Sequence, residues 1–236
     1  MSNSYAALAA YYDAIMTSGY YDYDAYARAL LDHIGEGRDV LELGVGTGLV
    51  CEHLLAMSPA GLRITGLDHT ESMLDRARAR LGDRVHLVQR DILDEEPLPA
   101  LFDAAYSVGG VWYGVHDGHD TWLGSHLTED DDNLRALANV TRALRPSGTL
   151  LLAVQEPHRA YTRPLPDGLR YAQKVDDHGG GRFTKDYRVL KDERVLAHQR
   201  SPFRLQPRSQ ADALFRRCGL RRADDGAGRF LRYVRV

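Results

Sequence analysis

The sequence predicts an α/β fold in which a mostly parallel sheet carries helices on both faces. Short apolar runs alternate with segments of helical periodicity between residues 37 and 154, a pattern typical of strand–helix–strand units. A glycine-rich turn ends the first apolar run and opens the helix that follows it. Beyond residue 154, longer runs alternate apolar and polar residues, which indicates antiparallel strands added to this sheet.

The first two parts of the expected single domain are a helical cap and a core. Residues 1–36 form the cap, because residues 3–16 and 22–34 carry apolar side chains at helical spacing. Residues 37–154 form the core, in which Thr70 is expected to cap a helix. Core strands are expected at residues 39–43, 62–67, 85–89, 102–107 and 149–154, and core helices at 47–57, 70–81 and 130–144.

The last two parts are expected to complete this core, with no linker between them. Residues 155–208 form an antiparallel insertion, which begins as a proline-rich loop to residue 168 and continues with strands at 169–175, 182–190 and 194–203. In the second of these strands, Phe183, Lys185, Tyr187 and Val189 alternate with polar residues, as in a half-exposed sheet. Residues 209–236 form a helix at 209–218 and a hairpin at 220–223 and 229–234.

The composition argues against several classes of protein. The 236 residues carry a net charge of -3 without a strongly basic stretch, which argues against a nucleic-acid partner. No apolar run is long enough to cross a membrane, and the N-terminus lacks the features of a signal peptide, so a cytoplasmic protein is expected. The two cysteines, Cys51 and Cys218, suit neither a disulfide framework nor a metal site.

Candidate ligand contacts follow each of the first three predicted strands. The segment Glu42-Leu43-Gly44-Val45-Gly46-Thr47-Gly48 ends the first strand, and its glycines permit positive φ and close backbone approach. Asp68 follows the second strand, where a carboxylate can accept hydrogen bonds from both hydroxyls of a ribose. Asp91 and Ile92 follow the third strand and offer an acceptor for an exocyclic amine and an apolar surface for a purine. Together they predict a nucleoside site.

A dinucleotide is the competing ligand for this edge of the sheet. Its fingerprint is G-x-G-x-x-G, whereas here the third glycine comes one residue earlier. Glu42 also precedes the turn, and a carboxylate there suits a cationic ligand better than a pyrophosphate. The methionine portion of S-adenosylmethionine carries such charges, as an ammonium and a sulfonium.

Residues 38–154 resemble the class I S-adenosylmethionine-dependent methyltransferases through segment 42–48, Asp68 and Asp91-Ile92. The resemblance implies a Rossmann-like, mostly parallel seven-stranded sheet with an antiparallel last strand, and S-adenosylmethionine as cofactor. In that family the glycine loop lies against the methionine portion, the first acid binds the ribose and the second binds the adenine amine. The expected cofactor contacts are Tyr12, Tyr20, Glu42, Gly44, Gly46, Gly48, Asp68, His69, Met73, Asp91, Ile92 and Ser107.

The two ends of the chain are similar to small-molecule N-methyltransferases, including those acting on amino sugars and other natural-product amines. The similarity rests on Tyr12-Asp13, the tyrosine-rich run 20–26 and the meander after the fifth core strand. In such enzymes the N-terminal helices fold over the cofactor, and an early tyrosine contacts it. Tyr12 and Tyr20 are the candidates here, with Tyr11, Tyr21 and Tyr23 as alternatives.

The acceptor is expected at the ends of the fourth and fifth core strands, because loops there build the site in this fold. Segment 107–120 is rich in glycine, aromatic residues and histidine; ordinary loop packing and solvated histidines are the alternative interpretation. Candidate proton acceptors are Tyr113, His116 and His119, and candidate acceptor contacts are Trp112, Gln155, Glu156 and Tyr171.

No metal site is expected. His116, Asp117, His119, Asp120 and His126 lie close together in sequence, but residues 107–110 lack the acidic ligands that metal-dependent O-methyltransferases place after the fourth strand. The expected function is methyl transfer to a polar small molecule, with N-methylation of an amine ahead of O-methylation. An NAD-dependent oxidoreductase and a non-catalytic S-adenosylmethionine-binding protein are the alternatives, and the meander would also allow a homodimer.

Overall fold

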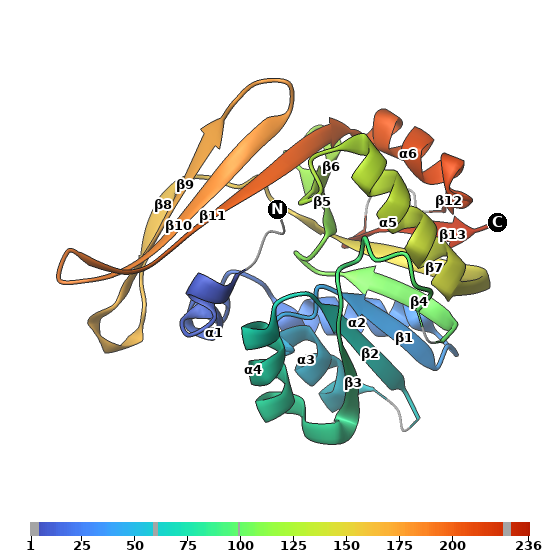
Figure 1. Cartoon of the computed structure of the whole chain (residues 1–236), viewed down its shortest axis with the longest axis horizontal. Helices are drawn as coiled ribbons and strands as arrows, with labels where there is room; N and C mark the ends of the chain where they lie inside the picture. The colour runs from blue at the N-terminus through green and yellow to red at the C-terminus, as the bar shows by residue number, and fades with distance from the viewer. Residues whose placement is uncertain (1–4, 59–60, 99, 224–227) are drawn as a thin grey trace.

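A computed structural model describes residues 5–58, 61–98, 100–223 and 228–236. Its core strands follow the order β3-β2-β1-β4-β7-β13-β12, and β13 runs antiparallel to both of its neighbours (Figure 1). This is the predicted α/β class, a mostly parallel sheet with an antiparallel last strand, and the fold prediction is confirmed. The core strands are β1 (Asp39–Leu43), β2 (Arg63–Asp68), β3 (Val85–Gln89), β4 (Phe102–Ser107), β7 (Leu144–Gln155), β12 (Leu220–Arg222) and β13 (Phe230–Arg235).

Helices cover both faces of this sheet because its strands are apolar on both sides. Val40 of β1 packs into one buried cluster, whereas the next residue, Leu41, packs into the other, as the alternation of side chains along a strand requires. The first cluster is covered by α2 (Tyr23–Ile34), α3 (Leu49–Met57) and α4 (Glu71–Leu81), and the second by α5 (Asp130–Ala143) and α6 (Arg208–Arg217).

Hydrogen bonds of residues next to the helices determine where α2 and α4 begin, and at α4 they differ from the prediction. The carboxylate of Asp22 accepts a hydrogen bond from the amide of Ala25 at 3.0 Å and starts α2. Thr70 occupies the predicted N-cap position of α4, but its side chain makes no capping hydrogen bond. Its own amide donates instead to the carboxylate of Asp68, which belongs to the strand end before the helix. A short 3-10 turn, η2 (Gly82–Arg84), joins α4 to β3.

The segment predicted as an acceptor-side loop is a hairpin. Its strands are β5 (Trp112–His116) and β6 (Thr121–Ser125), and β5 also pairs in parallel with the end of β7. The glycines in this segment suggest a loop, but Gly114 and Gly124 lie inside the strands. Side chains therefore alternate here, and Trp112 and Tyr113 point to opposite faces.

The insertion forms a meander that is continuous with the core. Its strands are β8 (Tyr161–Pro164), β9 (Arg170–Asp177), β10 (Arg182–Lys191) and β11 (Arg194–Pro207). The long strand β11 pairs with β6 and so extends the sheet. Figure 1 shows the four strands reaching out to one side of the core. Strand β8, which is followed by the short turn η3 (Pro166–Gly168), lies within the segment expected to be a loop.

The N-terminal cap consists of two short pieces where a single helix was expected over residues 3–16. They are the 3-10 turn η1 (Ala6–Leu8) and the helix α1 (Tyr12–Met16), and residues 3 and 4 lie outside the described part. Helix α1 lies beneath the meander and near α4 (Figure 1). No helix in the described ranges has the length and apolar character needed to cross a membrane.

Candidate functional site

The glycine turn after β1 has the geometry that a closely approaching ligand requires. The amides of Gly44 and Val45 donate to the carbonyl of Leu67 at 2.8 and 2.9 Å, which ties the turn to the end of β2. Gly48 has a φ of 81°, and a Cβ there would lie 2.6 Å from Cδ1 of Leu81. Only glycine therefore fits the position at which α3 begins.

The ends of the neighbouring strands present polar atoms along the same edge. The two carboxylate oxygens of Asp68 accept hydrogen bonds from the amides of Gly46 (2.9 Å) and Thr70 (2.8 Å). Asp91 accepts a hydrogen bond from the amide of Leu93 at 3.0 Å, after β3. Both acids are partly exposed, which leaves them accessible to a ligand.

Two buried polar atoms at this edge have no hydrogen-bond partner within the described residues. They are Oγ of Ser107, at the end of β4, and Nε2 of His69, beside Asp68. Buried polar atoms are normally paired, so these two sites are suited to receive hydrogen bonds from a bound molecule. The predicted contacts Met73 and Ile92 supply buried apolar surface near the same strand ends.

Glu42 lies beneath the glycine turn with its carboxylate almost fully buried. The Cys51 thiol and the Tyr106 hydroxyl donate to its Oε2 at 2.8 and 3.1 Å. Burial raises the pKa of Glu42 to about 8, in spite of these two hydrogen bonds. Cys51 is thus a hydrogen-bond donor as well as a small core residue, and no cation among the described residues balances the carboxylate.

Helix α1 folds over the glycine turn. A Cβ on Gly46 would lie 3.9 Å from the ring of Tyr12, which places that predicted cofactor contact directly against the turn. The neighbouring Asp13 accepts hydrogen bonds from the Thr47 hydroxyl and from the Arg80 guanidinium, both at 2.6 Å. These bonds link the cap, the turn and α4.

Two adjoining cavities open at the ends of β5 and β7. The outer cavity has a volume of about 620 Å³, which is within the usual range for a small-molecule site. The inner cavity is about 20 Å³ and reaches Tyr12 and Gly109, next to the glycine turn. Residues that line both cavities are Tyr20, Tyr21, Gln155 and His158. The inner cavity therefore connects the acceptor side to the cofactor side.

Three polar groups converge on Nε2 of His158 at the junction. The amide nitrogen of Gln155, the hydroxyl of Tyr113 and the ammonium of Lys185 each lie 3.2 Å from it. Burial, followed by the nearby charge of Lys185, lowers the pKa of His158 well below its ordinary value. The His158 ring is therefore neutral, and its tautomer decides which of these contacts it accepts.

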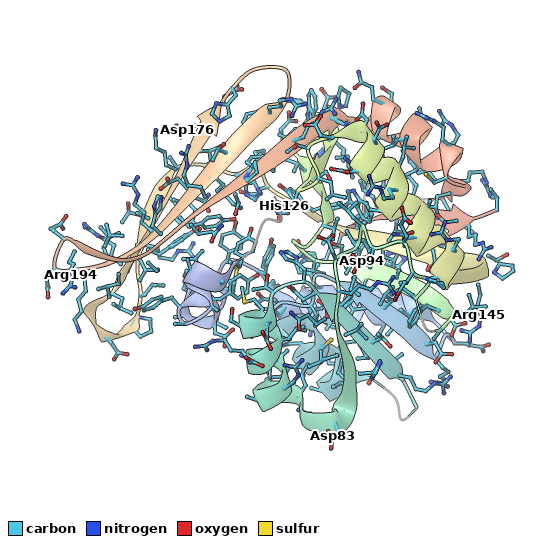
Figure 2. The ribbon with its side chains drawn as sticks, viewed as in Figure 1. Asp83, Asp94, His126, Arg145, Asp176 and Arg194 are labelled. Atoms are coloured by element: carbon cyan, nitrogen blue, oxygen red, sulfur yellow. The ribbon has the colours of Figure 1, made fainter. Side chains whose placement is uncertain are left out.

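Lys185 projects from β10 into the inner cavity and is 3% exposed. Its ammonium donates to the hydroxyl of Tyr20 at 3.1 Å and lies 5.0 Å from the centre of the Tyr187 ring. Burial lowers its pKa to about 7. Burial and Lys185 also lower the pKa of His126 to about 4; His126 lies between the meander and the core (Figure 2). The cavity thus penalises positive charge.

The acceptor-side residues predicted from the sequence lie in different parts of the structure. Tyr113 lines the inner cavity, and His116 and Glu156 line the outer one. Trp112 instead points into the core, where its indole donates to Asn133 at 2.7 Å, because adjacent strand residues face opposite ways. His119 is exposed in the turn of the hairpin, its amide bonded to Asp117.

Two further placements follow from the meander. Tyr171 is buried within it and donates to Gln173, so it does not line either cavity. Lys185 was not predicted as a site residue, although the alternation along β10 places it on the same face as Tyr187. That the face is the inner one depends on how the meander folds back, which the alternation does not reveal.

Within the described ranges, no group of three or more His, Cys, Asp or Glu residues is arranged to hold a metal ion.

Gly124 makes the position of Tyr113 possible, and its replacement tests the inner cavity. A Cβ on Gly124 would lie 2.3 Å from the Tyr113 ring. Gly124→Ala is therefore expected to displace this ring and lower the free energy of unfolding by roughly 1–3 kcal/mol, measured by urea denaturation. Tyr113→Ala in the same chain should relieve part of the loss. Additive effects of the two substitutions would contradict the contact.

Comparison with known proteins agrees with the fold and the strand-end geometry. Residues 40–148 match a family model described as a methyltransferase domain. An uncharacterized methyltransferase of Geobacillus sp. (strain WCH70) is 32% identical over 117 residues, which cover 50% of this chain and 47% of the relative. An O-methyltransferase of Aspergillus sclerotiorum is 28% identical over 122 residues, which cover 50% of this chain and 39% of the relative. The chain spans less than half the length of either.

Solved structures share the whole fold. CalS10 bound to S-adenosylmethionine, an amino pentose methyltransferase from Micromonospora echinaspora involved in calicheamicin biosynthesis, has a TM-score of 0.70 over 95% of this chain and 96% of its own, at 21% identity. The chain thus has the fold of these methyltransferases, and its residues 40–148 match a methyltransferase domain. The dinucleotide-dependent alternative receives no support.

Proposed function

We propose that this chain transfers a methyl group from S-adenosylmethionine to an amine on a polar small molecule. The observation that carries the proposal is the inner cavity, which connects the glycine turn to an outer cavity of small-molecule size and is lined by basic and aromatic groups. No carboxylate lines the inner cavity among the described residues.

The strand-end residues fit the cofactor. Asp68 would accept hydrogen bonds from the ribose hydroxyls, Asp91 from the adenine amine, and Glu42 would balance the ammonium of the methionine portion. The unpartnered atoms of Ser107 and His69 supply further polar contacts, and Tyr12 covers the glycine turn. When bound, S-adenosylmethionine supplies an electrophilic methyl group on a positively charged sulfur.

The electrostatics of the cavity favour a neutral amine. An amine reacts with the methyl carbon only through a free lone pair, so an ammonium must first lose a proton. Burial lowers the pKa of Lys185 to about 7 because the charged form loses hydration. The same surroundings would lower the pKa of an acceptor ammonium placed beside Lys185. The site would thus hold its acceptor in the reactive form and exclude water.

The other residues have supporting roles in this proposal. The Tyr113 hydroxyl, whose pKa burial raises well above its ordinary value, serves as a hydrogen-bond donor to His158 and not as a base. His116 and Glu156 contact the body of the acceptor in the outer cavity. Trp112, His119 and Tyr171 have no place in it, because none lines a described cavity.

O-methylation is the second candidate function. A hydroxyl acceptor needs a base to remove its proton, and the inner cavity holds nitrogen bases whose pKa values are lowered. The O-methyltransferase relative supports the same reading. Assays with S-adenosylmethionine and matched amino and hydroxy sugars, with products identified by mass spectrometry, would distinguish the two reactions.

Replacing Asp68 tests the cofactor assignment. Asp68→Ala is expected to weaken the binding of S-adenosylhomocysteine by roughly 1–3 kcal/mol, because a charged hydrogen-bond partner of the ribose is lost. Isothermal titration calorimetry measures this change. The control is Asp75→Ala, which removes an exposed carboxylate that pairs with Arg78 on α4 and should leave affinity unchanged. Equal affinity of the Asp68 variant and the wild type would refute the ribose contact.

A further inference from the structure

We propose that Lys185 is the catalytic proton acceptor, and that the reacting amino group of the acceptor enters the inner cavity beside its Nζ atom. This inference rests on the proposed methyl transfer and names the base within the same site. It replaces the histidines and the tyrosine that the sequence suggests for this role.

The position of Lys185 is determined by the middle of the meander. On β10 it pairs with Ser201 of β11 on one side and with Val175 of β9 on the other, so its backbone is held in a three-stranded sheet. Hydrogen bonds to Tyr20 at 3.1 Å and to Nε2 of His158 at 3.2 Å then fix the Nζ atom. The side chain is a pre-oriented group within the cavity.

The surroundings of this amine leave it without a counter-ion. Strands, loops and cap all present neutral or basic groups to it: tyrosines from the cap and the sheet, and two histidines. These groups are Tyr5, Tyr12, Tyr20, Tyr21, Tyr113, Tyr187, His126 and His158. No ion pair joins Lys185 to a carboxylate in the described part of the chain. A buried lysine of this kind loses its proton readily, and its pKa falls to about 7.

The sizes of the two cavities fit a small reacting group on a larger body. About 20 Å³ is roughly the space one water molecule needs, and an amino group is of similar size. The outer cavity of about 620 Å³ can hold the rest of the acceptor. Because Tyr12 and Gly109 also line the inner cavity, a group in it lies between Lys185 and the cofactor edge.

The reaction balances with this assignment. The acceptor ammonium gives its proton to the neutral amine of Lys185, which becomes an ammonium. The freed nitrogen lone pair forms a bond to the methyl carbon, and the carbon–sulfur bond breaks with its electron pair remaining on sulfur. The products are S-adenosylhomocysteine and a methylated, positively charged amine. Solvent takes the proton from Lys185 after product leaves.

The first test measures Lys185 directly and needs no acceptor. The chain contains only three lysines, Lys174, Lys185 and Lys191, so carbon-13-labelled lysine gives a simple NMR titration. The Lys185→Met variant assigns its signal, and the exposed Lys174 and Lys191 serve as internal references. A midpoint near pH 7 supports the proposal, whereas a midpoint near that of the two reference lysines overturns it.

The second test follows turnover of the acceptor that the sugar assays identify. Lys185→Met is expected to lower kcat by roughly 100-fold or more and to abolish the fall in kcat/KM below about pH 7. Lys185→Arg keeps a positive charge that cannot leave and should be equally inactive. The matched control is Lys174→Met, which removes an exposed lysine paired with Asp176 of the same strand, β9, and should behave as wild type.

Calorimetry with S-adenosylhomocysteine separates failure of this inference from failure of the proposed function. If the wild type neither binds S-adenosylhomocysteine nor methylates any acceptor, the proposed function fails. If the wild type does both and Lys185→Arg retains activity, Lys185 is a fixed positive charge for an anionic group, and the inference fails. Unchanged affinity and circular dichroism in each variant show that it is folded.

Discussion

Gly110→Ala is expected to destabilise the protein more than an alanine at any of the other close-packed glycines of the cofactor edge. A Cβ at Gly110 would lie 2.2 Å from the carbonyl oxygen of Leu43, the last residue of β1. That atom is backbone and cannot rotate away, so one of two chain segments must move. Overpacking of this kind costs roughly 1–3 kcal/mol and in tight places more, and we expect at least about 3 kcal/mol here.

The same displacement should weaken cofactor binding. Leu43 leads directly into the glycine turn, and Gly44 and Gly110 are themselves so close that a Cβ on Gly44 would lie 3.0 Å from Cα of Gly110. We expect at least about tenfold weaker binding of S-adenosylhomocysteine, or about 1.4 kcal/mol. Gly228→Ala is the control, because its Cβ would meet no atom closer than 3.9 Å. A Gly110→Ala variant as stable as this control would contradict the close approach.

Glu42→Gln is expected to stabilise the ligand-free protein above neutral pH. The pKa of Glu42 rises from 4.5 to about 8 on folding, so between these values the folded state holds a proton that the unfolded state has released. Its contribution to stability is therefore present below about pH 4.5 and is lost as pH rises toward about 8. The glutamine retains an oxygen acceptor for Cys51 and Tyr106 but cannot ionise.

The difference between variant and wild type isolates this effect from other titrating groups. Lys185, His126 and His158 have lowered pKa values and change stability in the opposite sense, but they are common to both proteins. Urea denaturation should show the variant gaining on the wild type from about pH 5 to about pH 8.5, by on the order of 3 kcal/mol. Parallel pH profiles would mean that Glu42 ionises normally.

Binding of the cofactor should favour the ionised form of the Glu42 carboxyl over its protonated form. An ammonium placed near the carboxylate favours its charged form, so binding of S-adenosylhomocysteine to the wild type would expel a proton below about pH 8. Affinity should then increase with pH, by up to about tenfold per unit, and Glu42→Gln should abolish this dependence. Calorimetry at several pH values measures both.

The core of the fold could be predicted because its signals are local. Glycine spacing after the first strand, together with acids after the second and third, depends only on sequence neighbours and on parallel strands sharing an edge. The structure places β1, β3 and β4 at the predicted residues and begins β2 one residue later. Asp68 and Asp91 accordingly lie at the ends of adjacent strands, where the sequence places them.

The acceptor side was harder to predict because its contacts are distant in sequence. Tyr113 and His158 meet Lys185 only after β11 pairs with β6 and the meander folds over the cap. Trp112 illustrates a different error, since a glycine-rich, aromatic segment suggests a loop, whereas as a strand its adjacent residues must face opposite ways. The alternation of side chains along β10 was visible in the sequence. It did not show that the face bearing Lys185 is the buried face.

The most direct test of the central claim is a crystal structure of the protein with S-adenosylhomocysteine. We expect the adenosine to lie across the ends of β1, β2 and β3, with its ribose on Asp68, its adenine amine on Asp91, and its sulfur directed toward the inner cavity and Lys185. Density for the ligand elsewhere, or strand ends that stay closed by Tyr12 and α1 at saturating ligand, would contradict the account.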